Sequence, residues 1–351
     1  MSRTHAALLT NILLLTACGG GEHHSSGNPP TPRTLPWQTL TTAAFDASNG
    51  QTGTILLSTA EQRQALRVSA AADQCFQVVS ALSRYGSELS RPFARRQCPD
   101  CGWRTAVIQG AGLLVLEGPA QDLTTIRFGR VNCDTLAALD SSGTLRLETL
   151  SSERPAKPTI TLRLVLSDRV HTTLDTARLA TDVAAELGID VQVAATLTIA
   201  DTDILLSSST DIGPLQALLA DLPVKDEGLI DVVIGPCLEQ SSAFGTQRLA
   251  GITPRIPGGT GAGDAVFIAR RSCGSRNEAA ADPAETARLA AHELGHYLGL
   301  QHPAEADGTL DDFADTDTHN LMHREPLRAD ASGLTEEQRA RMLAHPFVMS
   351  R

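Results

Sequence analysis

Short runs in which apolar and polar residues alternate fill the chain between residues 37 and 155. Gly, Asp, Ser and Pro residues separate these runs, which are GTILLS (53–58), QALRVSA (64–70), CFQVVSAL (75–82), TAVIQGAGLLVLEG (105–118), TTIRFGRV (124–131) and GTLRLETL (143–150). Alternation with a period of two is typical of strands that bury one face. The sequence therefore predicts a small β-rich domain over 37–155, folded as a sandwich or a barrel.

A polar segment with two prolines, SSERPAKP (151–158), reads as a linker, and the pattern changes after it. Apolar runs predict strands at 160–168, 191–201, 228–237 and 264–273, and helical spacing predicts helices at 173–189, 212–222, 282–300 and 334–346. Pro254 and Pro257 cannot lie in a central strand, so 248–258 is expected to be an extended edge segment. We expect an α+β domain over 156–351, with a mixed sheet and two long helices.

The N-terminus has the features of an export signal. Arg3 precedes an apolar run over 6–17 that is too short to span a bilayer. The run ends in Leu-Thr-Ala-Cys18, which resembles a bacterial lipoprotein signal. That resemblance implies cleavage after residue 17, a lipid on Cys18, and an exported lipoprotein at the outer membrane or cell surface of a bacterium. The alternative is an ordinary secretory signal and a secreted protein. The Gly, Ser and Pro residues of 18–36 predict a flexible tether.

Charge and cysteine content narrow the functional classes. The net charge of −11 and the absence of a basic stripe argue against a nucleic-acid partner. An exported chain with six further cysteines is expected to form disulfides. The simplest pairing keeps each half to itself and joins Cys237 to Cys273. The first four cysteines are Cys75, Cys98, Cys101 and Cys133, and they can pair in three different ways.

Two histidines on the predicted helix 282–300 have the spacing of metal ligands. His292 and His296 are four residues apart, so they share one face of the helix and can reach one zinc ion. Glu293 lies one position round the helix, where a base for a zinc-activated water belongs. The alternative is a helix with histidines on one face and no metal.

A glycine and a third histidine extend this pattern. Gly299 can take the left-handed conformation that ends a helix and turns the chain, which lets His302 return to the same metal. Three neutral histidines leave one tetrahedral position open for water, as catalytic zinc requires. A structural site is instead closed by four protein ligands, often cysteines, and the motif contains none.

The spacing H-E-x-x-H-x-x-G-x-x-H resembles that of the metzincin clan of zinc metallopeptidases. The resemblance implies a zincin catalytic domain with a twisted mixed sheet, an active-site helix and a C-terminal helix. It also implies one catalytic Zn²⁺, endopeptidase activity on peptides or proteins, and Glu293 as general base and acid. The clan's second signature, the Met-turn, is matched by Met322. Arg324 stands where some subfamilies have a tyrosine, and features of pappalysin-like and serralysin-like enzymes leave the subfamily open.

An acidic stretch follows the motif. Residues 305–318 carry five aspartates, which suit a structural Ca²⁺, although the EF-hand spacing is absent and a solvated loop is the alternative that we favour. We expect a monomer that contacts the membrane only through its lipid anchor. The alternative to an enzyme is a zinc-binding surface adhesin or binding lipoprotein with little or no catalysis. An intact Glu293 argues for the enzyme.

Overall fold

The computed structural model describes residues 35–57, 63–92, 103–207, 212–235, 237–242, 245–259, 261, 263–271, 273–274, 282–305, 310–313, 319–327 and 333–350. Four predictions lie outside these residues, namely the signal peptide, nearly all of the tether, the lipidation of Cys18, and any pairing of Cys98 and Cys101. No helix within the described ranges is long and apolar enough to cross a membrane. Residues 33–351 form one compact unit.

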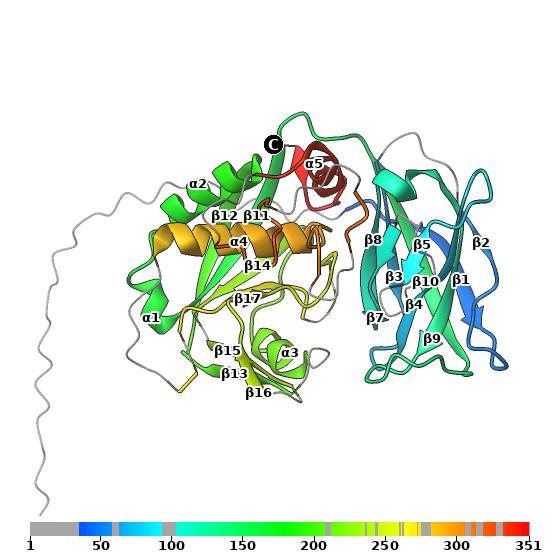
Figure 1. The fold of residues 1–351 in the computed structure, drawn as a ribbon, viewed down its shortest axis with the longest axis horizontal. Helices are drawn as coiled ribbons and strands as arrows, with labels where there is room; N and C mark the ends of the chain where they lie inside the picture. The colour runs from blue at the N-terminus through cyan, green and yellow to red at the C-terminus, as the bar shows by residue number, and fades with distance from the viewer. Residues whose placement is uncertain are drawn as a thin grey trace, which may run out of the picture. The chain divides into compact units, whose positions relative to one another are not determined.

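The first part of the described chain is a β-sandwich, seen in blue to green in Figure 1. Its two antiparallel sheets have the strand orders β1-β10-β3-β8 and β2-β9-β4-β7. The strands are β1 Gln38–Phe45, β2 Ile55–Leu56, β3 Arg63–Ser69, β4 Cys75–Ser83, β7 Ile108–Gln109, β8 Ala111–Leu116, β9 Leu123–Val131 and β10 Gly143–Ser152. A short parallel pair, β5 (Ser90–Pro92) and β6 (Trp103–Thr105), and the 3-10 helix η1 (Gly118–Asp122) also belong to this part.

Alternate residues of each strand form the core between the two sheets. Phe76 and Val78 of β4 are fully buried in it, as are Leu145 and Leu147 of β10 in the facing sheet. A disulfide joins Cys75, at the start of β4, to Cys133, just beyond β9. The predicted run 105–118 is split into β7 and β8 by Gly110, whose φ of +66° makes a tight turn.

A six-stranded sheet forms the centre of the rest of the chain. Four of its strands run parallel in the order β12 (Asp190–Ile199), β11 (Pro158–Ser167), β14 (Leu229–Ile234) and β18 (Val266–Ile268). β17 (Gly251–Ile252) pairs antiparallel with β18 at the edge, and β19 (Met349–Ser350) pairs antiparallel with the start of β11. The result is the mixed sheet that the sequence predicts.

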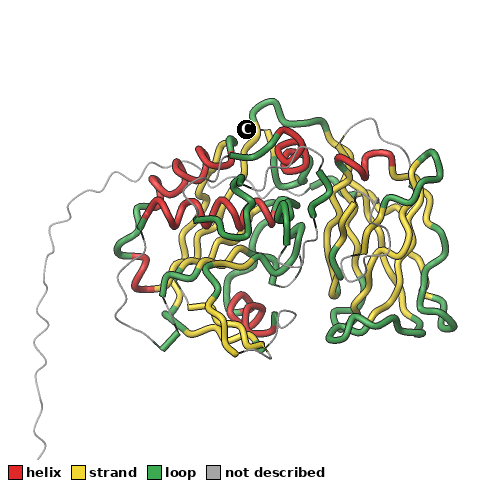
Figure 2. The backbone as a smooth tube through the Cα atoms, viewed as in Figure 1, coloured by secondary structure: helices red, strands yellow, loops and turns green. Residues whose placement is uncertain are grey.

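Helices cover both faces of this sheet (Figures 1 and 2). α2 (Thr176–Leu187) and α4 (Pro283–Tyr297) share a core with alternate strand residues such as Leu164, while α3 (Gly213–Ala220) shares a core on the other face with residues such as Val165. The inner strands β11, β14 and β18 are therefore buried along most of their length, whereas β12 at the edge has no fully buried residue. The other helices are α1 (Asp168–His171) and α5 (Glu336–Leu343), and α5 begins with a capping box formed by Thr335 and Gln338.

Three features of this part differ from the sequence prediction. The predicted strand 228–237 is broken at Gly235, which has a φ of +126° and no room for a Cβ beside Ser167. The chain then enters a small second sheet with the order β13 (Asp203–Leu206), β15 (Cys237–Ser242) and β16 (Gly245–Arg248). Only three residues of the predicted strand 264–273 form β18.

The disulfide between Cys237 and Cys273 agrees with the pairing predicted from the sequence.

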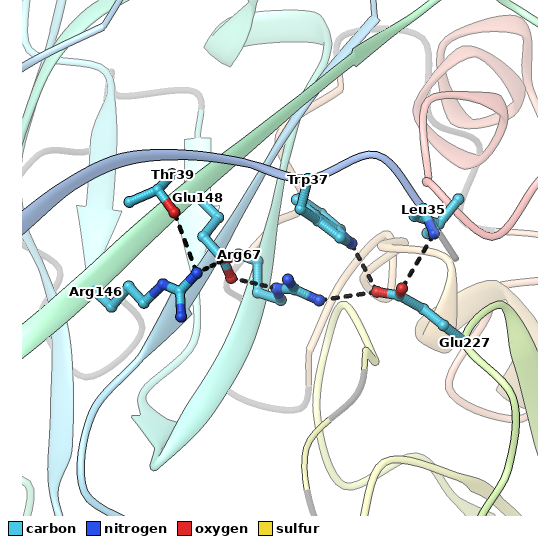
Figure 3. Close-up of polar contacts among 7 residues, drawn as sticks. All are labelled: Leu35, Trp37, Thr39, Arg67, Arg146, Glu148 and Glu227. Atoms are coloured by element: carbon cyan, nitrogen blue, oxygen red, sulfur yellow. Dashed lines mark hydrogen bonds and ion pairs between the residues drawn. The ribbon is translucent and has the colours of Figure 1, made fainter. Parts of the chain in front are cut away.

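A charged network joins the sandwich to the second part of the chain (Figure 3). Glu227 precedes β14, and its carboxylate accepts hydrogen bonds from Trp37 Nε1 (2.7 Å) and from the backbone N–H of Leu35 (3.1 Å). Arg67 of β3 pairs with Glu227 at 2.8 Å and with Glu148 at 2.6 Å. These contacts, named here the Glu227 network, hold the start of the sandwich against the loop before β14.

Candidate metal centre

The helix α4 begins and ends where its sequence requires. The Asp282 carboxylate accepts a hydrogen bond from Ala284 N (2.7 Å), and Pro283 occupies the first helical position, where its missing N–H costs nothing. The helix is buried on nearly every side in its second half. His292 and His296 are therefore only 3% and 5% exposed.

The turn after α4 brings in the third histidine. Gly299 has a φ of +102°, and its N–H donates to His296 O (3.0 Å), while Leu300 N donates to Gly295 O (3.0 Å). A residue with a Cβ is strained at this φ, so glycine is the natural residue here. The reversal places His302 Nε2 at 3.1 Å from His296 Nε2.

The three imidazoles converge through the same ring nitrogen. His292 Nδ1 is hydrogen-bonded to Leu321 O (2.8 Å), His296 Nδ1 to Leu300 O (2.8 Å), and His302 Nδ1 to a carboxylate oxygen of Glu305 (3.0 Å). Such a partner on one nitrogen fixes the tautomer that leaves the other nitrogen free to bind a metal. One ligand atom from each ring lies within 4.8 Å of the others. The donor set thus fits a divalent metal that accepts three nitrogen ligands.

Burial keeps the helix histidines in their metal-binding form. Desolvation lowers the pKa of His292 to about 3, and it lowers the pKa of His296 well below its ordinary value. Neutral imidazole is the form that ligates metals. Both residues therefore present neutral ligands throughout the physiological pH range.

Glu293 is a buried carboxyl beside the triad. Desolvation raises its pKa to about 8, against the opposing effect of a hydrogen bond from Thr253 Oγ1 (2.9 Å). The same hydroxyl lies 2.8 Å from the backbone oxygen of Glu293. Gly251 of β17 also lies close to this carboxyl, since a Cβ on it would be 2.7 Å from Glu293 Oε1. The carboxyl is thus held between α4 and the edge strand, and it takes up protons near neutral pH.

Met322 lies under the helix that carries the histidines. It is fully buried, and its sulfur packs against Gly295, the residue before His296. Its backbone N–H donates to Asn320 Oδ1 (2.8 Å), and the neighbouring Leu321 supplies the oxygen that binds His292 Nδ1. This turn therefore supports the triad from below through one apolar and one polar contact.

A cleft of ≈ 710 Å³ opens over the triad. Residues 247–253 and 324–327 line this cleft, together with the three histidines and Glu293. A second cavity of ≈ 600 Å³ lies between β12, β13 and α3, but no cluster of ligand or nucleophilic side chains lines it. Tyr297 does not face the cleft, because it is fully buried and donates its hydroxyl to Gly259 O (2.8 Å). We therefore take the cleft over the triad as the functional site.

Sequence reasoning missed three residues of this centre. The sequence predicts Thr253 and Gly251 only as parts of an edge segment, and Glu305 only as the first residue of an acidic loop. The spacing of Glu305, three residues after His302, was the one local signal for a carboxylate partner. For calcium, Asp312 is paired with Arg341 at 3.0 Å, and the metal-type clusters among the described residues include no aspartate of this loop. The other aspartates of the loop, except Asp311, lie outside the described residues.

Comparisons with known proteins give only distant likenesses. No family model matches this chain, and no curated protein matches its sequence. Among solved structures, archaemetzincin from Methanopyrus kandleri is 16% identical over 52% of this chain and 86% of its own, with a TM-score of 0.28. Metalloproteinase-II from Bacteroides fragilis is 14% identical over 57% of this chain and 62% of its own, with a TM-score of 0.34. A zinc-dependent peptidase from Methanocorpusculum labreanum is 11% identical over 52% and 99%, with a TM-score of 0.32. The functional argument therefore rests on this chain's own residues.

Proposed function

We propose that the protein is a zinc-dependent endopeptidase of the metzincin type, with His292, His296 and His302 as the zinc ligands. The observation that carries the proposal is the shared arrangement of the three rings. Each has its Nδ1 engaged by an oxygen of the protein, which directs the three Nε2 atoms to one point beside a buried carboxyl. If the histidines lay on this helix by chance and bound no metal, three such oxygen partners would not be expected.

Glu293 has the properties of the general base and acid of this reaction. When bound at the triad, zinc supplies Lewis-acid chemistry that makes water nucleophilic near neutral pH. In its ionised form, Glu293 would accept the proton from the attacking water and deliver it to the leaving amine. Thr253 fixes one carboxylate oxygen at 2.9 Å and so leaves the other for this proton transfer.

The edge strand β17 offers a binding mode for the substrate. It is the last strand of its sheet in the described part of the chain, and its residues line the cleft beside Glu293. An extended peptide can add to such an edge by backbone hydrogen bonds. Peptide or protein substrates therefore suit the cleft.

The test combines metal analysis with cleavage of a peptide library. The purified protein should hold one zinc ion, and the wild type should cut while Glu293→Ala should not. Removing the general base is expected to lower the rate by about 10²–10⁴-fold. His302→Ala should lose the metal as well as the activity. If the wild type and Glu293→Ala both bind zinc and neither cuts any peptide, the protein is a binding lipoprotein or adhesin instead.

We further propose that this activity operates outside the cytoplasm, on a chain anchored through Cys18. The support is the apolar N-terminal run ending at that cysteine, together with disulfides that suit an oxidising compartment. A monomer is proposed, with peptides or proteins as its partners.

A further inference from the structure

A strand of the sandwich reaches the third histidine of the triad. All three residues of β6 are buried, and the side chain of Arg104 is only 4% exposed. Its guanidinium lies 3.1 Å from Glu305 Oε1, while Glu305 Oε2 lies 3.0 Å from His302 Nδ1. Arg104, Glu305 and His302 thus form a continuous chain of polar contacts from the sandwich to the metal-binding ring.

His302 needs such support more than the other two ligands do. His292 and His296 are fixed by α4 and have backbone carbonyls as Nδ1 partners. His302 lies beyond the helix in a segment without regular structure, and its partner is the side chain of Glu305, which is 27% exposed. A partly exposed side chain has rotamer freedom, and a fixed guanidinium on its second oxygen removes that freedom.

The strand that carries Arg104 is itself held in place. The backbone N–H of Arg104 donates to Asp312 Oδ2 at 3.4 Å, and Arg341 of α5 pairs with the same oxygen at 3.0 Å. Asp312 is almost completely buried. The space between β6, β8 and the turn at Gly299 is only ≈ 10 Å³, which is about the least that one water molecule needs. Close packing therefore fixes Arg104 against the turn that delivers His302.

We propose that Arg104 is a positioning residue of the metal centre, through which the sandwich raises the affinity of the histidine triad for zinc. It holds Glu305 against His302 Nδ1, and this contact keeps His302 Nε2 directed at the metal. The inference rests on the proposed function, since it requires that zinc binds to the triad. It gives the sandwich a role in the reaction centre, although none of its residues contacts the metal.

The test measures zinc affinity in the full chain, not activity. Arg104→Met retains the length and apolar stem of the side chain and removes its charge, and Glu305→Gln removes the charge of the intermediate carboxylate. Outer partners of metal ligands typically contribute 10–100-fold in affinity, so each variant should raise the zinc Kd by about tenfold or more in competition with a chromophoric chelator. Arg104→Lys should recover part of the loss. The double variant should be no weaker than Glu305→Gln alone, because both act through one contact.

A matched control separates positioning from general docking. Glu227→Gln weakens the Glu227 network, which is another contact of the sandwich and lies outside the metal centre. It should lower the melting temperature of the metal-free protein and leave the zinc Kd within about twofold of wild type, a change well below the effect of an outer partner. Should Arg104→Met fail to fold, Arg104→Gln replaces it with the same expectation.

The outcomes are distinct. If wild type binds zinc tightly and Arg104→Met binds it equally well, the role of Arg104 is refuted and the proposed peptidase stands. Equal losses in Arg104→Met and Glu227→Gln also refute it, since docking alone would then explain both. If wild type binds no zinc, the proposed function itself fails.

Discussion

Replacing Glu293 by Gln should stabilise the metal-free protein relative to wild type as the pH rises. Burial raises the pKa of this carboxyl from 4.5 to about 8 in the folded protein. Between those values the folded state holds a proton that the unfolded chain has released. The contribution of Glu293 to stability is therefore fully present below pH 4.5 and is lost as the pH rises towards 8. Glutamine does not titrate and shows no such loss.

The size of the effect follows from the linkage between protons and folding. Each rise of one pH unit in this window lowers the unfolding free energy of the wild type by about 1.4 kcal/mol and leaves that of Glu293→Gln unaffected by this group. Between pH 5 and pH 7 the difference in unfolding free energy should thus move by about 3 kcal/mol in favour of Glu293→Gln. His292 and His296 titrate with the opposite sign, because burial lowers their pKa values, but both proteins contain them and the difference cancels their effect.

The assay is urea unfolding of both proteins at pH 5, 6 and 7 after removal of metal with a chelator. Glu148→Gln is a suitable control, because the hydrogen bond from Arg67 lowers the pKa of Glu148 below 4.5. The contribution of Glu148 to stability is lost only as the pH falls below 4.5. The difference in unfolding free energy between Glu148→Gln and wild type should therefore stay constant from pH 5 to 7. A constant difference for Glu293→Gln as well would refute the reasoning, since the carboxyl would then not be buried next to the triad.

Three further predictions concern other parts of the chain. Gly251→Ala should lower the peptidase rate by about 10- to 100-fold and leave the zinc Kd unchanged, because the three atoms nearest the new Cβ, from 2.7 Å, all belong to the Glu293 side chain. Steady-state kinetics and zinc titration check this prediction. Replacing both Cys237 and Cys273 by Ser should cost about 4 kcal/mol in denaturant unfolding, since the disulfide closes a loop of 36 residues. Cys18→Ser should abolish labelling by radioactive palmitate and release the protein from the membrane fraction.

Each of these has a control and a contrary result. Gly53→Ala, at a glycine with open space around it, should change neither rate nor Kd. Unchanged kinetics in Gly251→Ala would refute the close approach to Glu293. The double Cys→Ser variant should match wild type when both are reduced, and equal stability in the oxidised state would refute the constraint. Palmitate incorporation into Cys18→Ser would show that the lipid is attached elsewhere or that the signal is of another kind.

The sequence predicted those parts of the site that depend on local geometry. The spacing of His292 and His296 on a helix, and of Gly299 before His302, depends only on helix periodicity and on one left-handed residue. The same holds for most of the sandwich, where alternation identified strands whose inward residues form a single core. The run 38–45, which forms β1, was not predicted, and most of its side chains are exposed or half-buried.

The rest depended on contacts between distant segments. Arg104 and Glu305 are separated by two hundred residues of sequence, and nothing in the local pattern of either indicates the other. Thr253 and Gly251 acquire their roles only because β17 lies beside α4. The small sheet of β13, β15 and β16 was missed because its strands are short and partly polar, so that neighbouring chain segments, not periodicity, decide their structure.

The contact between Arg104 and Glu305 also limits how this gene could be recombined. Residues 153–157, between β10 and β11, form a short polar connection of the sort at which modules are usually exchanged between proteins. A foreign module grafted there would preserve all three histidines of the triad and still leave Glu305 without its arginine. Substitutions at positions 104 and 305 should consequently be inherited as a pair, and the two halves of the chain should share one evolutionary history.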